Sequence, residues 1–515
     1  MKPLPLYVLL LTSLTACADT AAPATSLASE ALDAAAGTIT ADDYFQRIGV
    51  IANDSMMGRD TPSPGLDATA NWIASEFERM GVAPAGENGT YFQRYAITSV
   101  RADFGSSSAE LDGTELSFGT DMSFPSGAVE GDLEGEVVVV SGSGTPDDRQ
   151  LAEAEGKHVL IIASGNGGGG GRRGRRADFR TIRSFQSSGA LSVVQASASD
   201  DAAWDRDVRR QRTNVGVRFG TSIRAPRVNI RDAALRPILS ARGLDLDALR
   251  SEAGSLTATA VPGLRLALTL RTEVIQDQTA PNVVGIVEGR DPELRDEFVV
   301  FSAHMDHVGT GTPDESGDSI FNGADDDASG TVTVVELAEA FASLDPAPRR
   351  SMIFLLVSGE EKGLWGSRYY ADNPTVPIDQ IVANLNADMV GRNWPDSIVV
   401  IGKEHSDLGA TMNRVNAEHP ELGMVAIDDI WPEQNFYSRS DHYNFARKGV
   451  PILFFFNGTH DDYHGRDDEV DRIDTEKASR IGKLMFYLGV EVAERTARPV
   501  WDPESYREIV EGAGR

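Results

Sequence analysis

The spacing of apolar residues changes along the chain, and each spacing predicts a different kind of element. Apolar positions recur at helical spacing after Thr40, a residue that can cap a helix, and again over 66–80, which predicts two amphipathic helices. Residues 91–100 have the composition of a strand. From 282 to 494, short apolar runs alternate with helical patterns, which is typical of an α/β fold with a mostly parallel sheet.

Between these parts, short β-rich runs predict a separate unit. We therefore expect an α/β domain with a mostly parallel, doubly wound sheet and helices on both faces, interrupted by an inserted β-rich domain. The expected bounds are 40–122 and 270–494 for the α/β domain, 123–265 for the insert, and 495–515 for a C-terminal tail that can dock on the body.

The N-terminus has the features of an export signal. Met1-Lys2 begins a short positive region, and residues 4–14 are apolar over the length of a signal-peptide core, too short to span a bilayer. Small residues followed by Cys17 resemble a bacterial lipobox, in which the cysteine is lipidated and becomes the first residue of the mature protein. We expect a lipoprotein signal peptide at 1–17 and a flexible tether, rich in Ala, Ser and Thr, at 18–39.

Cys17 is the sole cysteine, so it forms no internal disulfide, and lipidation explains its presence better than packing does. The alternative is an ordinary cleaved signal. The prediction is an exported protein of the bacterial cell envelope, bound to a membrane through a lipid on Cys17.

The charge composition limits which classes of binding partner are plausible. The formal net charge is −30 and the pI about 4.6, which argues against nucleic-acid binding and favours attraction of cations. A glycine run at 165–171 is followed by four arginines, but the pattern of a phosphate-binding loop is absent. A solvated loop is the preferred interpretation, and a basic patch for a partner is the alternative.

Candidate ligands follow four of the apolar runs, where open α/β sheets place their binding sites. They are His304, the pair Glu360 and Glu361, Asp388 and His464. Beside the first lies the acidic loop 322–330, NGADDDASG. Its adjacent carboxylates would repel one another without a counter-charge, and a divalent metal is the usual one. Zinc is the preferred ion, because His304 offers a neutral nitrogen.

Two zinc ions explain this set economically, since one bridging carboxylate can serve both ions. Five ligands and one free carboxylate match the set His304, Asp326, Glu360, Glu361, Asp388 and His464. Of the two adjacent glutamates, one would bind metal and the other would take a proton from the attacking water. Physical reasoning requires one residue in each role but does not say which is which.

The other histidines are weaker candidates for metal ligands. His442 is the main competitor of His464. His307 is expected to support a ligand or the fold rather than to bind metal. The remaining histidines are expected to be surface or structural residues: His158, His405, His419 and His460.

Several motifs together resemble the M28 family of zinc peptidases. They are AHMDHVG, NGADDDASG, SGEEKGLWGS, NADMVGR and YHGRDDEVDRID, in the family's order, and the resemblance covers about 41–125 and 270–490. It implies the zinc exopeptidase fold, and the inserted region is similar to a protease-associated (PA) domain. After the last histidine, the family's usual Thr-Pro is replaced by Gly465-Arg466.

The resemblance also implies a role for each candidate. One zinc would be held by His304 and Asp388 and the other by Glu361 and His464, with Asp326 bridging them. Glu360 would be the general base. Asp306 would orient the ring of His304, and Tyr463 would donate a hydrogen bond to the oxyanion.

The expected function is hydrolysis of N-terminal residues from peptides by a two-zinc aminopeptidase. A carboxypeptidase is one alternative, and it would need cations near the metals, for which Arg392 and Arg439 are candidates. A glutaminyl-cyclase-like enzyme and a non-catalytic, receptor-like binding protein are the others. The last is disfavoured because the full ligand set and the base are present.

Overall fold

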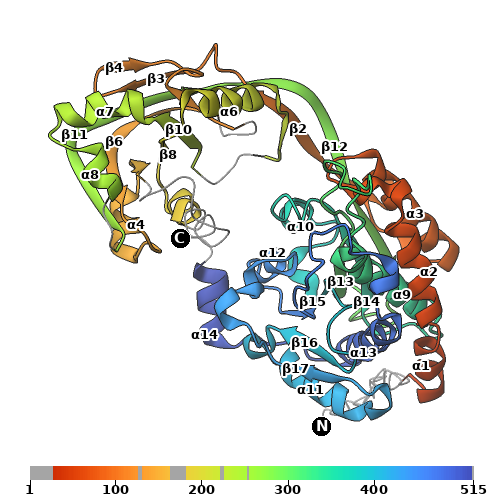
Figure 1. Cartoon of the computed structure of the whole chain (residues 1–515). Coiled ribbons are helices and arrows are strands. Elements are labelled where there is room, and N and C mark those ends of the chain that lie inside the picture. The colour runs from red at the N-terminus through yellow and green to blue at the C-terminus, as the bar shows by residue number, and fades with distance from the viewer. Residues whose placement is uncertain (1–26, 126–129, 163–180, 221–224, 252–254, 513–515) are drawn as a thin grey trace, which may run out of the picture.

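The computed structural model describes residues 27–125, 130–162, 181–220, 225–251 and 255–512. Two β-sheets organise this part of the chain, one in each of the two bodies in Figure 1. The larger sheet has the order β17-β16-β18-β15-β13-β14-β12-β2-β9, with β1 paired to β12. Its strands are β1 (Ala83–Pro84), β2 (Phe92–Ala102), β9 (Gly216–Arg218), β12 (Thr272–Val287), β13 (Phe298–His304), β14 (Ser351–Val357), β15 (Ile381–Ala387), β16 (Ser397–Ile401), β17 (Val425–Ile427) and β18 (Ile452–Phe456).

The larger sheet is mixed, which corrects the expectation of a mostly parallel one. Its central strands β14, β13, β15 and β18 are parallel to their neighbours in that series. On either side, β12 pairs antiparallel with β14, and β16 pairs antiparallel with β18. An apolar run predicts a buried strand but carries no information about its direction. The carboxyl ends of the four central strands meet at one edge, where a site is expected.

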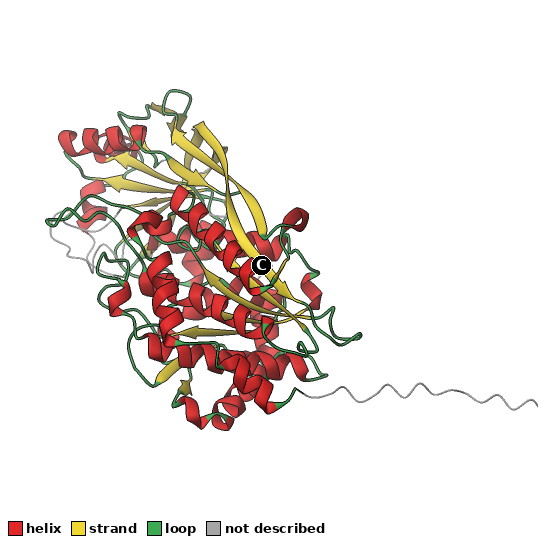
Figure 2. Cartoon of the chain, turned by 90° about the vertical axis from the view of Figure 1, so that its right-hand side faces the viewer, coloured by secondary structure: helices red, strands yellow, loops and turns green. Residues whose placement is uncertain are grey.

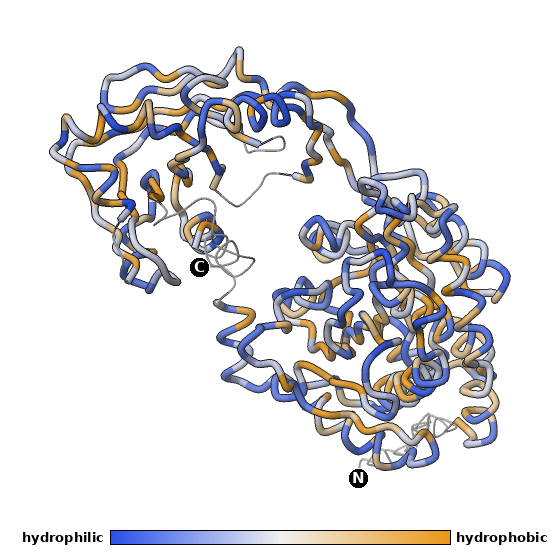
Figure 3. Tube along the Cα trace, viewed as in Figure 1, coloured by the Kyte–Doolittle hydropathy of each residue, from blue (hydrophilic) through white to orange (hydrophobic). Residues whose placement is uncertain are grey.

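Helices cover both faces of this sheet, as predicted (Figure 2). The helices on one face are α1 (Ser29–Ala36), α2 (Ala41–Ile51), α3 (Pro64–Met80), α9 (Gly330–Ala342), α11 (Leu408–Glu418) and α13 (Thr475–Glu494). The other face carries α10 (Trp365–Asp372) and α12 (His442–Ala446). Strands β13, β14 and β15 are buried along their whole length, which explains their continuous apolar character. In Figure 3 the apolar segments follow these inner strands.

The smaller body is built on an eight-stranded sheet of order β4-β3-β11-β6-β7-β8-β10-β5. Its strands are β3 (Ser108–Leu111), β4 (Thr114–Leu116), β5 (Met122–Ser123), β6 (Gly131–Ser141), β7 (His158–Ile161), β8 (Ser192–Ser197), β10 (Arg227–Arg231) and β11 (Thr257–Leu270). Its helices are α4 (Asp148–Ala154), α6 (Asp201–Thr213), α7 (Asp232–Ala241) and α8 (Leu246–Ser251). It has apolar clusters of its own, distinct from those of the larger sheet.

The extent of this second sheet differs from the expected insert at 123–265. It begins at Ser108 and ends at Leu270, so it is longer at both ends. Within that range, β9 pairs with β2 of the larger sheet. The two sheets share a ribbon: β2 and β12 pair antiparallel, and the chain runs from β2 into β3 and from β11 into β12 (Figure 1). The likeness to a PA domain stays a prediction.

The described ends of the chain pack on the larger body. Ser29–Ala36 is a helix with buried Ala35 and Ala36, so the expected tether at 18–39 is wrong from Ser29 onward. The C-terminal segment includes α14 (Pro503–Tyr506), and Trp501 Nε1 donates to the carbonyl of Gly449 at 2.9 Å. Cys17 and the glycine–arginine segment 165–176 lie outside the described residues. Among the helices of the described chain, none has the length and apolarity that crossing a bilayer would need.

Candidate metal centre

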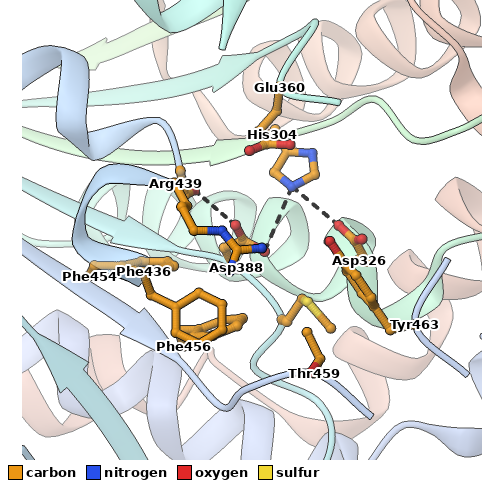
Figure 4. Close-up of a pocket in the computed structure, with 12 residues that line it drawn as sticks. His304, Asp326, Glu360, Asp388, Phe436, Arg439, Phe454, Phe456, Thr459 and Tyr463 are labelled. Atoms are coloured by element: carbon orange, nitrogen blue, oxygen red, sulfur yellow. Dashed lines mark hydrogen bonds and ion pairs between the residues drawn. The ribbon is translucent and has the colours of Figure 1, made fainter. Parts of the chain in front are cut away.

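His304 ends strand β13 and presents one ring nitrogen to two carboxylates (Figure 4). Its Nδ1 donates to the backbone carbonyl of Asp306 at 3.1 Å, so in the neutral ring Nε2 carries a lone pair. This Nε2 lies 3.3 Å from Asp326 Oδ1 and 3.7 Å from Asp388 Oδ1. All three residues are buried. Three acceptor atoms facing one another in the interior require a proton or a metal cation between them.

The backbone explains why Asp326, of the three adjacent aspartates, faces this cluster. Asp325 Oδ1 accepts from the backbone N–H of Gly391 at 2.7 Å. Asp327 accepts from three backbone N–H groups, those of His304 at 3.1 Å, Gly330 at 2.9 Å and Met389 at 3.1 Å. These two carboxylates thus join β13, β15 and the start of α9, and the middle one is left for the site.

A second donor set lies on the other side of Asp326. His464 Nε2 is 3.1 Å from Asp326 Oδ2 and 3.0 Å from Glu361 Oε1. His307 Nδ1 is 3.1 Å from the same Glu361 oxygen. Within the described residues, Glu361 Oε1 and both ring nitrogens of His307 are buried without a hydrogen-bond partner. Asp326 therefore offers one oxygen to each donor set, which is the position of a bridging ligand.

Charge at the site favours cations. Burial opposes protonation of His464, but Asp326 and Glu361 outweigh it and raise its pKa to about 10. Burial likewise opposes charge on His304, and the surrounding carboxylates nevertheless hold its pKa well above the usual range. The donors His304, Asp326 and Asp388 lie within 4.8 Å of one another, as do His307, Asp326 and Glu361. The chemistry and convergence of these atoms fit zinc, and they fall into two groups that share Asp326.

Sequence reasoning missed two residues that support this arrangement. Arg59, which no sequence pattern singles out, is fully buried and donates to the carbonyls of Met305 at 2.9 Å, Asn322 at 2.6 Å and Gly323 at 2.9 Å. Burial lowers its pKa to about 10, so it stays charged at neutral pH beside the carboxylates. It fixes both the turn after His304 and the start of the acidic loop.

Asp468 is the second missed residue. It lies four positions after His464 and is fully buried. Its carboxylate accepts from the backbone N–H of Asp325 at 3.0 Å and of Asp326 at 3.1 Å. The loop that carries one histidine is thereby connected to the loop that carries the bridging aspartate.

The two adjacent glutamates take different positions. Glu361 belongs to the second donor set, whereas Glu360 lines the pocket beside His304, Asp326 and Asp388 (Figure 4). Burial and nearby carboxylates raise the pKa of Glu360 well above its usual range. Its backbone N–H donates to Asp306 Oδ1 at 3.2 Å.

Asp306 is expected to orient the ring of His304 through its carboxylate. Its backbone carbonyl makes the hydrogen bond to His304 Nδ1, and its carboxylate lies 3.7 Å from the same nitrogen. That carboxylate also accepts from the Thr61 hydroxyl at 3.0 Å. Asp306 therefore connects the histidine at the end of β13 with the segment that carries the glutamate pair.

The structure separates the remaining histidines. His442 donates through Nε2 to the carbonyl of Tyr437 at 2.8 Å and stacks on Phe454, so it lies outside both donor sets. His460, expected at the surface or in a structural role, has 5% of its side chain exposed and lies 3.2 Å from Asp325 Oδ2, one residue from the bridging position. His158 is buried and pairs with Ser192.

The pocket beside the donors has one polar and one apolar wall (Figure 4). The apolar wall is formed by Met389, Phe436, Phe454 and Phe456. Tyr463 lines the pocket, and its ring stacks on that of His464 with centroids 4.0 Å apart. The pocket has the shape and lining to hold a small apolar group next to the donor atoms.

Comparison with known proteins agrees with this chemistry. Residues 282–489 match the family model described as Peptidase family M28. Aminopeptidase YwaD of Bacillus subtilis is 25% identical over 239 residues, covering 45% of this chain and 49% of that protein. A probable zinc metalloprotease of Leptosphaeria maculans is 29% identical over 244 residues, covering 39% and 55%. The chain thus spans about half the length of these curated relatives.

Among solved structures, the aminopeptidase from Aneurinibacillus sp. strain AM-1 superposes with a TM-score of 0.51. The match covers 91% of this chain and 97% of that one at 19% identity. At this identity the likeness shows a shared fold and no more. The family match and the named relatives together support a zinc-dependent peptidase.

Proposed function

We propose that this protein is a two-zinc aminopeptidase that removes N-terminal residues from peptides. The observation that carries the proposal is the position of Asp326 between two donor sets. His304 and Asp388 form one set, and Glu361 and His464, with His307 beside them, form the other. This is the ligand assignment expected from the family resemblance, and the convergence of donor atoms supports it.

The chain's own residues suit hydrolysis at this site. Zinc bound here would supply Lewis-acid chemistry, polarising a carbonyl and making water more acidic. The carboxylate of Glu360, which belongs to neither donor set, would accept the proton of the attacking water and deliver it to the leaving amine. Tyr463 would donate a hydrogen bond to the oxyanion from the same pocket.

An aminopeptidase is preferred for two reasons. The named bacterial relatives are aminopeptidases, and carboxylates at the pocket can hold a substrate's free α-ammonium group. The alternatives are a carboxypeptidase, a glutaminyl-cyclase-like enzyme and a receptor-like protein. For a carboxypeptidase, Arg392 is a poor candidate, because it is paired with Asp462 at 2.8 Å. The receptor alternative is disfavoured by the complete donor set.

The purified protein is expected to contain about two zinc ions per chain, because each donor set suits one. Removal of zinc by a chelator should abolish hydrolysis of L-leucine p-nitroanilide and of short peptides, and added zinc should restore it. The measurements are elemental analysis and a continuous assay. The C-terminally blocked peptide should be cleaved and the N-acetylated peptide should not. Undiminished hydrolysis by metal-free protein would contradict the proposal.

We also propose that the protein is exported and anchored in the bacterial envelope by a lipid on Cys17, on the basis of the sequence alone. Because the thioether-linked lipid would be the anchor, Cys17→Ser should move the protein from the membrane fraction to the soluble fraction. Cell fractionation with an antibody against the folded body measures this. Ser13→Ala, in the same segment, is the matched control. Equal membrane association of Cys17→Ser and wild type would show that another feature anchors the chain.

A further inference from the structure

Arg439 lines the same pocket as the candidate metal donors His304, Asp326 and Asp388. It shares the pocket with Glu360 and Asp388, and Figure 4 shows its side chain reaching in beside Asp388. Within the described residues, no hydrogen bond or ion pair of its guanidinium is found. Its position is set by its chain neighbour, since Ser440 Oγ donates to Asp388 Oδ2 at 2.8 Å.

The guanidinium is held by an aromatic ring rather than by a carboxylate. Its central carbon lies 4.6 Å from the ring centroid of Phe436, a buried residue of the apolar wall. Stacking of this kind restricts the side chain and leaves the planar donor edge available. Arg392, also close to the site, has its cation neutralised by Asp462. Arg439 is exposed to solvent, and among the lysines and arginines of the described chain it is the one that lines this pocket.

We propose that Arg439 binds a carboxylate of the substrate and so determines specificity. This inference rests on the proposed peptidase function and names a substrate class for it. A guanidinium fork matches a carboxylate in geometry and charge, and such pairs are among the stronger hydrogen-bonded contacts. With zinc bound, the negative charge of the donor carboxylates would be balanced, and Arg439 would offer a cation beside Phe436 of the apolar wall.

Two parts of a peptide can supply that carboxylate. One is the C-terminal carboxylate of a short peptide, above all a dipeptide, whose far end lies one residue beyond the scissile bond. The other is the side chain of an acidic N-terminal residue, whose methylene groups would lie on Met389 and Phe456. Both place an anion next to Arg439 while the peptide carbonyl faces the metals.

Matched substrate pairs test the proposal and distinguish the two sources. Leu-Ala and Leu-Ala-amide differ in the terminal carboxylate, and Glu-Ala-amide and Gln-Ala-amide differ in the side-chain carboxylate. For at least one pair, the wild type should have a kcat/KM about ten- to hundredfold higher for the peptide that carries the carboxylate. This ratio corresponds to the usual contribution of a hydrogen bond to a charged group. Arg439→Gln should reduce that ratio nearly to one, and Arg439→Lys should give an intermediate ratio.

The control is Arg368→Gln. Arg368 also stacks on an aromatic ring, with its guanidinium carbon 4.6 Å from the centroid of Phe219, but it does not line the pocket. Its substitution should leave both acid-to-amide ratios at the wild-type values. Equal kcat/KM values within both pairs for the wild type, or a preference that survives in Arg439→Gln, would overturn the role of Arg439.

Binding in the Glu360→Gln background separates this inference from the proposed function. Calorimetric titration of that zinc-loaded variant with the same pairs measures affinity without turnover. A carboxylate-dependent affinity that vanishes on adding Arg439→Gln supports the role of Arg439, even if the wild type hydrolyses no peptide and the peptidase proposal fails. Hydrolysis with no carboxylate dependence of rate or affinity would remove the role of Arg439 alone.

Discussion

Replacement of Glu360 by glutamine is expected to lower kcat by about 10²–10⁴-fold, the usual contribution of a general base, while zinc content stays at the wild-type level. The amide keeps the size of the side chain but cannot accept the proton of the attacking water. KM should change little, because the lost interaction belongs mainly to the transition state. The measurements are steady-state kinetics with L-leucine p-nitroanilide and elemental analysis of the same preparation.

The adjacent residue provides the decisive comparison. Glu361 Oε1 lies 3.0 Å from His464 Nε2 and 3.1 Å from His307 Nδ1, so Glu361→Ala should lower zinc occupancy and activity together. Excess zinc should restore part of the activity of Glu361→Ala and none of the activity of Glu360→Gln. If Glu360→Gln empties a zinc site and Glu361→Ala retains both ions, the two roles are reversed.

The positions of most candidate ligands could be predicted because buried parallel strands have a recognisable sequence pattern. Strands β13, β14 and β15 are covered on both faces, so each is a continuous apolar run whose end is easy to locate. Polar residues just after such runs gather at one edge of the sheet. The direction of the flanking strands could not be predicted, because an apolar run is the same in a parallel and an antiparallel pair.

In the acidic loop, the sequence pattern predicts a cation site but not which aspartate faces it. Three adjacent aspartates indicate a cation site, but the pattern itself does not distinguish Asp326 from Asp325 and Asp327. In the fold, Asp325 and Asp327 accept hydrogen bonds from the backbone of Gly391 and Met389, which are distant in sequence. The choice among the three thus depends on contacts between β13, β15 and α9 that no local pattern records.

Arg59 and Asp468, which support the site, could not be predicted either, because their roles depend on contacts with residues that are distant in sequence. Arg59 lies in an irregular segment with no periodic pattern, and its partners are backbone carbonyls, which every residue carries. Asp468 lies within a motif that was noticed, but Asp467 and Glu469 beside it are equally acidic. Burial distinguishes it, since Asp468 is fully buried and Asp467 is exposed. His307 is expected from the sequence to support a ligand or the fold. In the structure its Nδ1 lies in the second donor set.

Substitution of Asp326 by alanine is expected to remove more than one zinc ion per chain and to reduce hydrolysis to the level of metal-free enzyme. The bridging position explains this, because one oxygen faces His304 and the other faces His464. Loss of a ligand to one ion alone, as in Asp388→Ala, should leave the other ion largely bound. Elemental analysis at increasing free zinc, together with activity, measures the difference.

Asp327→Ala is the matched comparison within the same loop, because it separates loss of metal from loss of fold. The carboxylate of Asp327 accepts three backbone N–H groups, and each buried donor left unpaired costs about 1–3 kcal/mol. Without metal, Asp327→Ala should therefore melt well below the wild type. Metal-free Asp326→Ala should melt closer to the metal-free wild type than Asp327→Ala does, since the partners of the Asp326 side chain are the rings of His304 and His464 and no backbone N–H. Full zinc content in Asp326→Ala, or a melting temperature of its metal-free form far below that of the wild type, would show that Asp326 supports the loop rather than the metals.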